Sequence, residues 1–253
     1  MTLAFTPPPL TDSPVSRLDP RWKLAALAVA VLATAILRTL PASALALLLA
    51  LLLAGLSRLP PRWYLARLGA AVLFLAFFAL PLPFLLREPG MEGSSLLHFS
   101  WHGAAVGLML TAKGLTLVTL MLVLLATAPL DATLKAAHSL RVPGLLVHLG
   151  LLTFRYAFLL ADELGRLRVA LRVRGYRNRA TRHCYRTVGH VTGTLLVRGH
   201  ERAERVGHAM RCRGFDGRFR ALTDFRTRPA DVLASLVVVA AAAGIWWLDR
   251  LLS

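Results

Sequence analysis

Long apolar runs, separated by short polar breaks, occupy most of this chain. The runs that predict transmembrane helices are 24–37, 42–56, 63–86, 104–128 and 230–248. A helix needs about 20 apolar residues to cross a hydrocarbon core about 30 Å thick. The first two runs fall short of this length, which leaves open a tilted arrangement or a hairpin that does not fully cross. The pattern predicts an all-α, polytopic membrane protein with about five transmembrane helices.

The composition favours a membrane protein over a soluble or disordered one. Hydrophobic residues make up 56% of the chain and charged residues 17%, against about 45–50% and 25% in soluble domains. The mean hydropathy is +0.59. The chain nevertheless has 30 lysines and arginines against 13 aspartates and glutamates, which gives a net charge of +17. Most of this excess lies between Leu130 and Arg228.

The distribution of basic residues predicts the orientation of the chain, because cytoplasmic loops of membrane proteins are enriched in lysine and arginine. Basic residues precede the first apolar run and surround the break after the second, whereas the loop 87–103 is nearly neutral. These basic residues are Arg17, Arg21, Lys23, Arg58, Arg62 and Arg67. We therefore expect a cytoplasmic N-terminus, an external loop 87–103 and an external C-terminus.

One more apolar segment, 144–160, is long enough to suggest a sixth crossing. It contains His148 and Arg155, and a crossing there would place the following basic block outside the cell. We therefore interpret the segment as cytoplasmic. The expected organisation is an N-terminal membrane domain with about four spans (1–129), a cytoplasmic module (130–228) and a C-terminal transmembrane helix (229–253).

The cytoplasmic module is expected to consist of helices. A short helix is predicted at 131–139, ending before Pro143, and two long helices are predicted at 144–174 and 194–213. Each long helix carries apolar residues at helical spacing along one face. Glu201 and Arg205 form a helix-supporting pair on the other face of the second long helix.

Both long helices end with the same residue pattern, Arg-x-Arg-Gly-aromatic. The two copies are Arg172-Val173-Arg174-Gly175-Tyr176 and Arg211-Cys212-Arg213-Gly214-Phe215. Glycine and arginine are common at helix C-termini, so ordinary capping explains either copy alone. Two copies on matched helices favour docking, because arginine donates several hydrogen bonds to the carboxylates or carbonyl oxygens of a partner.

Together with other motifs, these helix ends resemble the transmembrane coupling (T) subunit of energy-coupling factor (ECF) transporters. The other motifs are Leu18-Asp19-Pro20-Arg21-Trp22-Lys23, Leu140-Arg141-Val142-Pro143 and Glu201-Arg202-Ala203-Glu204-Arg205. The stretches 186–189 and 210–219 are similar to the cobalt/nickel branch of that family, the CbiQ-like proteins. The resemblance extends over residues 18–253 and is strongest over 140–219.

The resemblance implies a non-catalytic subunit of an ABC importer for cobalt or nickel ions in the bacterial inner membrane. In that family, two cytoplasmic coupling helices end in Ala-Arg-Gly motifs that dock on two ABC ATPase subunits, which hydrolyse the ATP. The matching docking residues are Arg174, Gly175, Arg213 and Gly214. Val173 and Cys212 replace the alanine of the motif.

The resemblance also implies a substrate-binding (S) membrane subunit and a small auxiliary membrane subunit as partners within the lipid bilayer. The residues expected to pack against the S subunit are Leu149, Leu152, Tyr156, Leu196, Ala203, Val206 and Met210. No cofactor is expected, and the metal site of that family belongs to the S subunit. Coupling to another micronutrient, such as a vitamin, is the alternative function within the family.

A membrane-embedded enzyme is a less favoured alternative. A P-loop ATPase requires Gly-x-x-x-x-Gly-Lys-Ser/Thr, and the sequence contains no Gly-Lys pair. Apart from Asp231 at an edge, the predicted spans carry no acidic or histidine cluster. Nucleic-acid binding is not expected, because a basic face beside a membrane attracts acidic lipid without any dedicated function.

Few other residues suggest chemistry. His98 and His102 have the spacing of metal ligands on a helix but no cysteine or carboxylate nearby, so no metal site is expected. Cys184 and Cys212 are interpreted as structural.

Lys113 lies within the fourth predicted span. A charge in a span is a functional candidate, with snorkelling or a backbone partner as the equal alternative. Four glycines are expected to allow close helix packing: Gly55, Gly69, Gly107 and Gly114.

Overall fold

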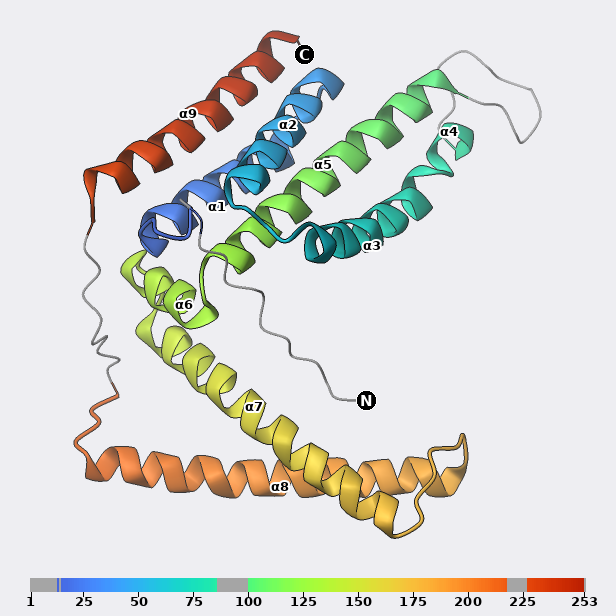
Figure 1. The fold of residues 1–253 in the computed structure, drawn as a ribbon, viewed down its shortest axis with the longest axis vertical. Coiled ribbons are helices and arrows are strands. Elements are labelled where there is room, and N and C mark those ends of the chain that lie inside the picture. Colours follow the sequence, from blue (N-terminus) through green and yellow to red (C-terminus); the bar gives the residue numbers. More distant parts are fainter. Residues whose placement is uncertain (1–12, 14, 86–99, 218–226, 253) are drawn as a thin grey trace. The chain divides into compact units, whose positions relative to one another are not determined.

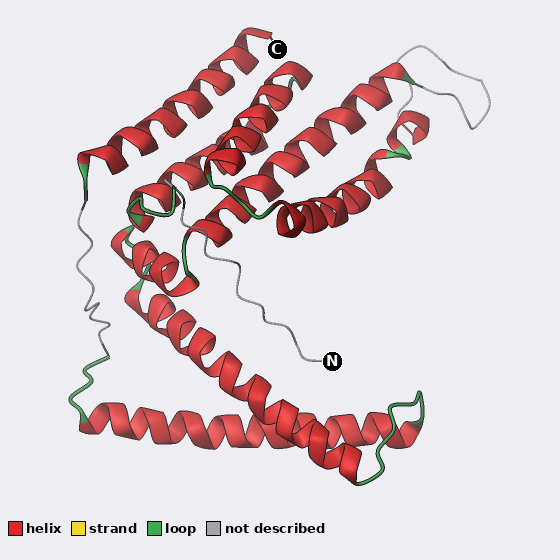
Figure 2. Cartoon of the chain, viewed as in Figure 1, coloured by secondary structure: helices red, strands yellow, loops and turns green. Residues whose placement is uncertain are grey.

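The computed structural model of the protein describes residues 13, 15–85, 100–217 and 227–252. Within these ranges the chain consists of α-helices and loops, without strands, which confirms the predicted all-α class (Figure 2). The helices are α1 (Pro20–Ile36), α2 (Leu40–Leu56), α3 (Pro61–Ala79), α4 (Leu82–Leu85), α5 (Trp101–Thr127), α6 (Leu130–Ser139), α7 (Gly144–Val173), α8 (Arg182–Cys212) and α9 (Pro229–Leu252).

The chain divides into two compact units. The helix-pair unit runs from Arg141 to Leu222 and contains α7 and α8 (Figure 1). The bundle unit contains α1 to α6 and α9. The predicted short helix 131–139 is present as α6, and it packs against α1 in the bundle unit. The domain boundaries expected after residues 129 and 228 differ from these divisions and remain a prediction.

Small residues hold the helices of the bundle unit close together. Ala42, Ala46, Ala50 and Ala54 follow one another at intervals of four residues along α2, and all four are buried. Small side chains at this spacing allow helix backbones to approach closely, which is how helices associate in lipid. The central apolar cluster joins four helices through Leu27, Ala30, Ala50, Leu120 and Ala242.

Glycines of α5 make the contact with α3 and α4 even closer. A Cβ atom added at Gly103 would lie 2.6 Å from the carbonyl oxygen of Leu82, and one added at Gly107 would lie 3.2 Å from that of Ala79. At Gly114, an added Cβ atom would lie 2.7 Å from the side chain of Leu75.

The predicted role of Gly107 and Gly114 in helix packing is therefore confirmed. The same prediction is wrong for Gly55 and Gly69 within this chain. Among the described residues, no atom outside the glycine's own stretch of helix lies within 4 Å of the Cβ position at either glycine.

Within the described ranges, four helical segments are long and apolar enough to span a membrane: Pro61–Leu85, Trp101–Thr127, Gly144–Val173 and Pro229–Leu252. Three of them match predicted spans, so the protein is a multi-pass membrane protein. The predicted third span is interrupted between α3 and α4, where Pro81 lies, and Pro83 follows within α4. The apolar helices α1 and α2 have 17 residues each, which agrees with the short first two runs.

Helix α7 qualifies as a span by length and composition alone. The basic residues that follow it are the reason to expect it in the cytoplasm, and this placement remains a prediction. The expected external loop 87–103, with Glu92 and His98, lies largely outside the described residues.

The predicted start of the second long helix is wrong by more than three turns. Helix α8 begins at Arg182 rather than at residue 194. Gly189 and Gly193, which lower helix propensity, interrupt the apolar pattern there. Two signals mark the true start: Thr181, whose side chain accepts a hydrogen bond from the backbone N–H of Cys184, and the helically spaced Val188, Val191 and Leu195.

Candidate functional site

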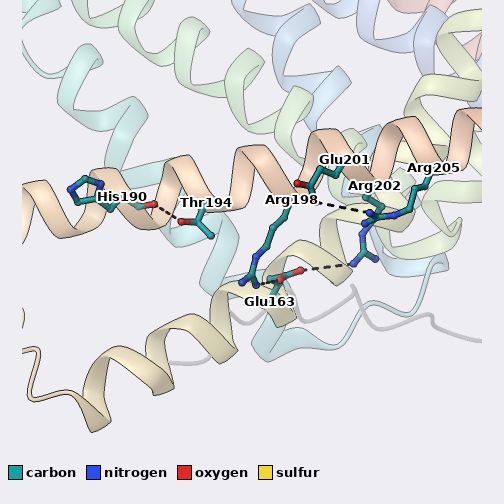
Figure 3. A network of polar contacts seen from close by, with 7 residues as sticks. All are labelled: Glu163, His190, Thr194, Arg198, Glu201, Arg202 and Arg205. Carbon is teal, nitrogen blue, oxygen red and sulfur yellow. Dashed lines mark hydrogen bonds and ion pairs between the residues drawn. The ribbon is translucent and has the colours of Figure 1, made fainter.

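Helices α7 and α8 cross (Figure 1), and a carboxylate is buried between them. Glu163 of α7 is 9% exposed and accepts a hydrogen bond from the guanidinium of Arg198 of α8. Arg202, one turn further along α8, lies 3.9 Å from the other carboxylate oxygen (Figure 3). Gly199 lies between these two arginines, and its Cβ position is 4.0 Å from the side chain of Leu160. This is an ordinary van der Waals distance, so the approach of the two helices at the ion pair does not require a glycine there.

The charges at the crossing reinforce one another. The hydrogen bond from Arg198 holds the pKa of Glu163 below its usual range, and the positive charges of Arg198, Arg166 and Arg202 act in the same direction. Glu163 is therefore ionised at neutral pH, and it binds α8 through two arginines rather than one. The predicted pair of Glu201 and Arg205 also forms, at 4.0 Å on an exposed face of α8.

The C-terminus of α7 is a complete Schellman motif. Arg174 is the capping residue and Gly175 has a left-handed backbone, with φ +80°. The backbone N–H of Gly175 donates to the carbonyl of Arg172 at 3.1 Å, and that of Tyr176 donates to the carbonyl of Leu171 at 3.0 Å. This pairing satisfies two carbonyl groups that the helix end would leave without partners.

The C-terminus of α8 repeats this geometry residue by residue. Arg213 is the capping residue and Gly214 also has φ +80°. The N–H of Gly214 donates to the carbonyl of Arg211, and that of Phe215 donates to the carbonyl of Met210, both at 3.0 Å. The shared sequence pattern thus produces two helix ends of the same local structure.

In both motifs the arginine is exposed and the following aromatic residue is half-buried. Arg174 and Arg213 are exposed, and neither side chain makes a hydrogen bond or ion pair with the parts of the chain that the structure describes. The ring of Phe215 stacks on His148 of α7, with centroids 5.3 Å apart. Tyr176 is half-buried near Cys184, and this burial raises the pKa of its hydroxyl. The aromatic residues therefore anchor the helix ends, while the arginines face solvent.

The two arginines lie on opposite sides of the crossing. The second half of α7 lines a groove with the first half of α8, through Leu164 and Leu171 on one side and Val188 and Leu195 on the other. The first half of α7 lies near the end of α8, as the stacking of His148 and Phe215 shows. Arg174 and Arg213 therefore point to separate places rather than to one.

The loop between the helices is fixed around Cys184. Its thiol is 7% exposed and donates to the carbonyl of Arg177 at 3.3 Å. The pKa of this thiol is lowered, mainly by its hydrogen bond with Thr181. Cys184 thus has the burial expected of a structural cysteine, whereas Cys212 is exposed.

The residues expected to pack against a partner remain accessible in the helix-pair unit. Leu149 is 50% exposed, Leu196 is 70% exposed and Ala203 is also exposed. The other members of this set are half-buried: Leu152, Tyr156, Val206 and Met210. Their role as a packing surface remains a prediction. Sequence reasoning missed Glu163, although it and the adjacent Asp162 are acidic residues among the leucines and arginines of α7.

Two charged residues of the bundle unit, Lys113 and Asp249, bind backbone groups. Lys113 donates a hydrogen bond to the carbonyl of Leu37 in the turn between α1 and α2, so a backbone partner is present. Asp249 of α9, 3% exposed, accepts hydrogen bonds from the backbone N–H groups of Arg38 and Thr39 and from the Thr39 hydroxyl, at 2.6–3.0 Å. Both residues fix the start of α2.

The structure describes His102 in the first turn of α5. Among the residues that it describes, no three histidine, cysteine, aspartate or glutamate side chains gather as a metal site.

The family model of the cobalt transport protein CbiQ matches residues 11–223 of this chain. The cobalt transport protein CbiQ of Rhodobacter capsulatus is 31% identical over 157 residues, which cover 62% of this chain and 61% of that protein. An uncharacterized protein of Methanocaldococcus jannaschii is 30% identical over 121 residues, or 47% of this chain and 44% of its own length. The chain thus matches less than two thirds of the length of these relatives. Since the family model matches most of the chain, this multi-pass membrane protein belongs to the CbiQ cobalt transport family.

Proposed function

We propose that this protein is the energy-coupling membrane subunit of an ECF-type ABC importer for cobalt or nickel ions. The observation that carries the proposal is the pair of matched Schellman motifs, which expose Arg174 and Arg213 on opposite sides of one helix crossing. Two equal docking sites in separate places suit two ATPase subunits. The family assignment supports cobalt as a substrate.

Each arginine would donate paired hydrogen bonds to carboxylates or carbonyl oxygens in a groove of one ATPase. A guanidinium is suited to this role because its donors form a fixed planar fork. The Schellman glycine ends the helix directly after the arginine, so that the guanidinium stands at the tip. ATP hydrolysis would take place in the partner subunits.

The crossing would transmit the motion of the ATPases. When two ATPases approach each other and separate, they would displace the ends of α7 and α8. The ion pair of Glu163 with Arg198 holds the helices together at one point, so the ends would move about that point rather than slide independently. The accessible apolar faces around Leu149 and Leu196 would pass this motion to the S subunit.

The proposed setting is the bacterial cytoplasmic membrane, with the N-terminus and the helix-pair unit in the cytoplasm. The arginine content of α7, α8 and their connecting loop supports this orientation. A small auxiliary membrane subunit would complete the complex.

The test is to purify the tagged chain from its own membranes in mild detergent and to identify the attached proteins by mass spectrometry. We expect ABC ATPase subunits and a second membrane protein in fixed ratio, and loss of cobalt or nickel uptake when the gene is deleted. Purification without any ATPase, or unchanged metal uptake in the deletion strain, would contradict the proposal.

A further inference from the structure

Two adjoining cavities lie at one end of the bundle unit, where α1 and α9 begin and α5 ends. The first has a volume of about 340 Å³ and is lined by apolar residues of α1, α2, α5 and α9, among them Leu27, Leu53 and Val123. The second, of about 510 Å³, is formed by the residues that flank these helix ends. Leu18 and Asp231 line both, so the cavities meet at these two side chains.

The apolar cavity is bordered by exposed apolar side chains. Leu56 and Val237, at its rim, are 57% and 66% exposed. Its volume is in the range of about 300–1,000 Å³ that is usual for small-molecule sites. A hydrocarbon chain from the bilayer suits such a space, because it requires no hydrogen-bond partners from the apolar lining.

The second cavity carries charges of both signs. Arg17 and Arg228 are exposed at its edge, and the carboxylates of Asp19 and Asp231 are buried, at 6% and 4% exposure. One oxygen of Asp231 accepts a hydrogen bond from the backbone N–H of Arg228 at 2.9 Å. The cavity is therefore suited to a group that itself carries a positive and a negative charge.

Asp19 has an oxygen left to bind such a group. Its Oδ1 caps α1 by accepting a hydrogen bond from the N–H of Arg21 at 3.1 Å. Its Oδ2 is buried and has no hydrogen-bond partner among the described residues. Leaving a buried carboxylate oxygen without a donor is unfavourable, and a ligand ammonium group would remove this deficit.

Lys23 of α1 is a buried cation beside the apolar cavity. It is 6% exposed and lines the apolar cavity. Its ammonium donates to the carbonyls of Val15 at 3.2 Å and Thr127 at 2.9 Å. An ammonium has three donors, so within the described part of the chain one remains for a phosphate or ester oxygen.

We propose that this pair of cavities binds one phospholipid with an ethanolamine headgroup. One acyl chain occupies the apolar cavity, the phosphate lies between Arg17 and Arg228, and the ammonium binds Oδ2 of Asp19. Basic pockets between membrane helices commonly hold lipid headgroups. The two buried carboxylates select the zwitterionic ethanolamine lipid over a purely anionic one.

The test uses the full-length protein in detergent, with native mass spectrometry to count bound lipids. Phosphatidylethanolamine and phosphatidylglycerol with the same acyl chains are titrated separately. We expect one phosphatidylethanolamine to bind at least about tenfold more tightly than phosphatidylglycerol, as for one charge-assisted hydrogen bond. Equal binding of the two lipids, or no retained lipid, would overturn the proposal.

Substitutions then test which side chains bind the lipid headgroup. Asp19→Asn should retain the fold because asparagine also caps helices, and it should abolish the preference for phosphatidylethanolamine. The double variant Arg17→Ala/Arg228→Ala should weaken both lipids, whereas Arg62→Ala, an exposed arginine outside the cavities, should change neither. An Asp19→Asn protein that keeps the preference would exclude the ammonium site, and equal effects of Arg62→Ala would indicate unspecific charge attraction.

Discussion

Arg198 of α8 donates a hydrogen bond to Glu163 of α7 where the two long helices cross, and the carboxylate is buried there. Arg202 lies close to the same carboxylate. One acidic residue thus connects α7 to two positions on α8. In the proposed function this contact determines whether the two helix ends move together.

Removing the carboxylate should weaken the contact between the helices without unfolding either one. We expect Glu163→Gln and Arg198→Gln each to lower the thermal unfolding midpoint, and the double variant to lower it by less than the sum of the two. The interaction free energy from this cycle should exceed that of the exposed pair Glu201 and Arg205, for which about 0.3–0.5 kcal/mol is typical. A cycle with no interaction between Glu163 and Arg198 would contradict the described crossing.

The contact should depend on pH only in the acid range. Because its hydrogen bond with Arg198 lowers the pKa of Glu163 below the unfolded value, the stabilisation is present above the unfolded pKa and is lost as pH falls through the folded pKa. The distance between spin labels at Val169 of α7 and Val197 of α8 should therefore stay constant from neutral pH down to about 4.3.

Below that pH, the distribution of this distance should broaden. In Glu163→Gln it should be broad at every pH. A change between neutral and mildly acidic pH in the unmodified protein would indicate that a histidine, and not Glu163, controls the crossing.

The glycines of the two helix ends should not tolerate a side chain. Gly175 and Gly214 have φ +80° with no atom within 4 Å of a Cβ position, so alanine there meets no clash but adopts an unfavourable backbone. We expect Gly175→Ala and Gly214→Ala each to cost about 1–2 kcal/mol, seen as faster hydrogen exchange in the last turn of the helix.

Gly165 in α7 is the matched control. It also has no atom within 4 Å of its Cβ position, but it lies in the helix without a positive φ. Gly165→Ala should stabilise α7 by about 0.5–1 kcal/mol. If all three alanine variants behave alike, the Schellman geometry does not determine the helix ends.

Much of the fold follows from the sequence because the apolar pattern and the end signals coincide. Helix α7 begins at Gly144 and ends one residue before the predicted position, since its stripe is continuous and Gly175 ends it. The early part of α8 was missed because Gly189 and Gly193 mask its apolar face. The pairing of Glu163 with Arg198 depends on where two helices cross, which no local pattern encodes.

The contact of Asp249 with the turn before α2 is hidden from the sequence for the same reason. Its three donors come from Arg38 and Thr39, at the opposite end of the chain. The matched helix ends at Arg174 and Arg213, by contrast, are local motifs, and the sequence predicted both.

The orientation of the chain in the membrane can be tested by cysteine labelling from either side. We expect a label at Arg182 to be cytoplasmic and labels at Glu92 and Ser253 to be external, because the basic residues cluster in the first of these regions. Labelling should be compared in intact and permeabilised cells, in a background without Cys184 and Cys212. A cytoplasmic Ser253 would exclude the five-span arrangement.

In the proposed function, Arg174 and Arg213 bind ATPases rather than merely cap helices. Loss of one partner of a buried charged hydrogen bond typically costs about 2–5 kcal/mol of binding, whereas loss of a favourable contact with the helix dipole costs about 0.3–1 kcal/mol of local stability. Lysine should restore binding only in part, because it lacks the planar fork of arginine. Arg179→Ala, in the exposed connecting loop, is the control.

The most direct measurement is the amount of ATPase that co-purifies with Arg174→Ala, Arg213→Ala and the double variant from membranes, together with metal uptake. We predict reduced ATPase recruitment in each single variant and almost none in the double variant, with unchanged membrane insertion and with Arg179→Ala close to the unmodified protein. If the double variant recruits ATPases and takes up metal at the unmodified rate, the two arginines are only helix caps and the coupling assignment fails.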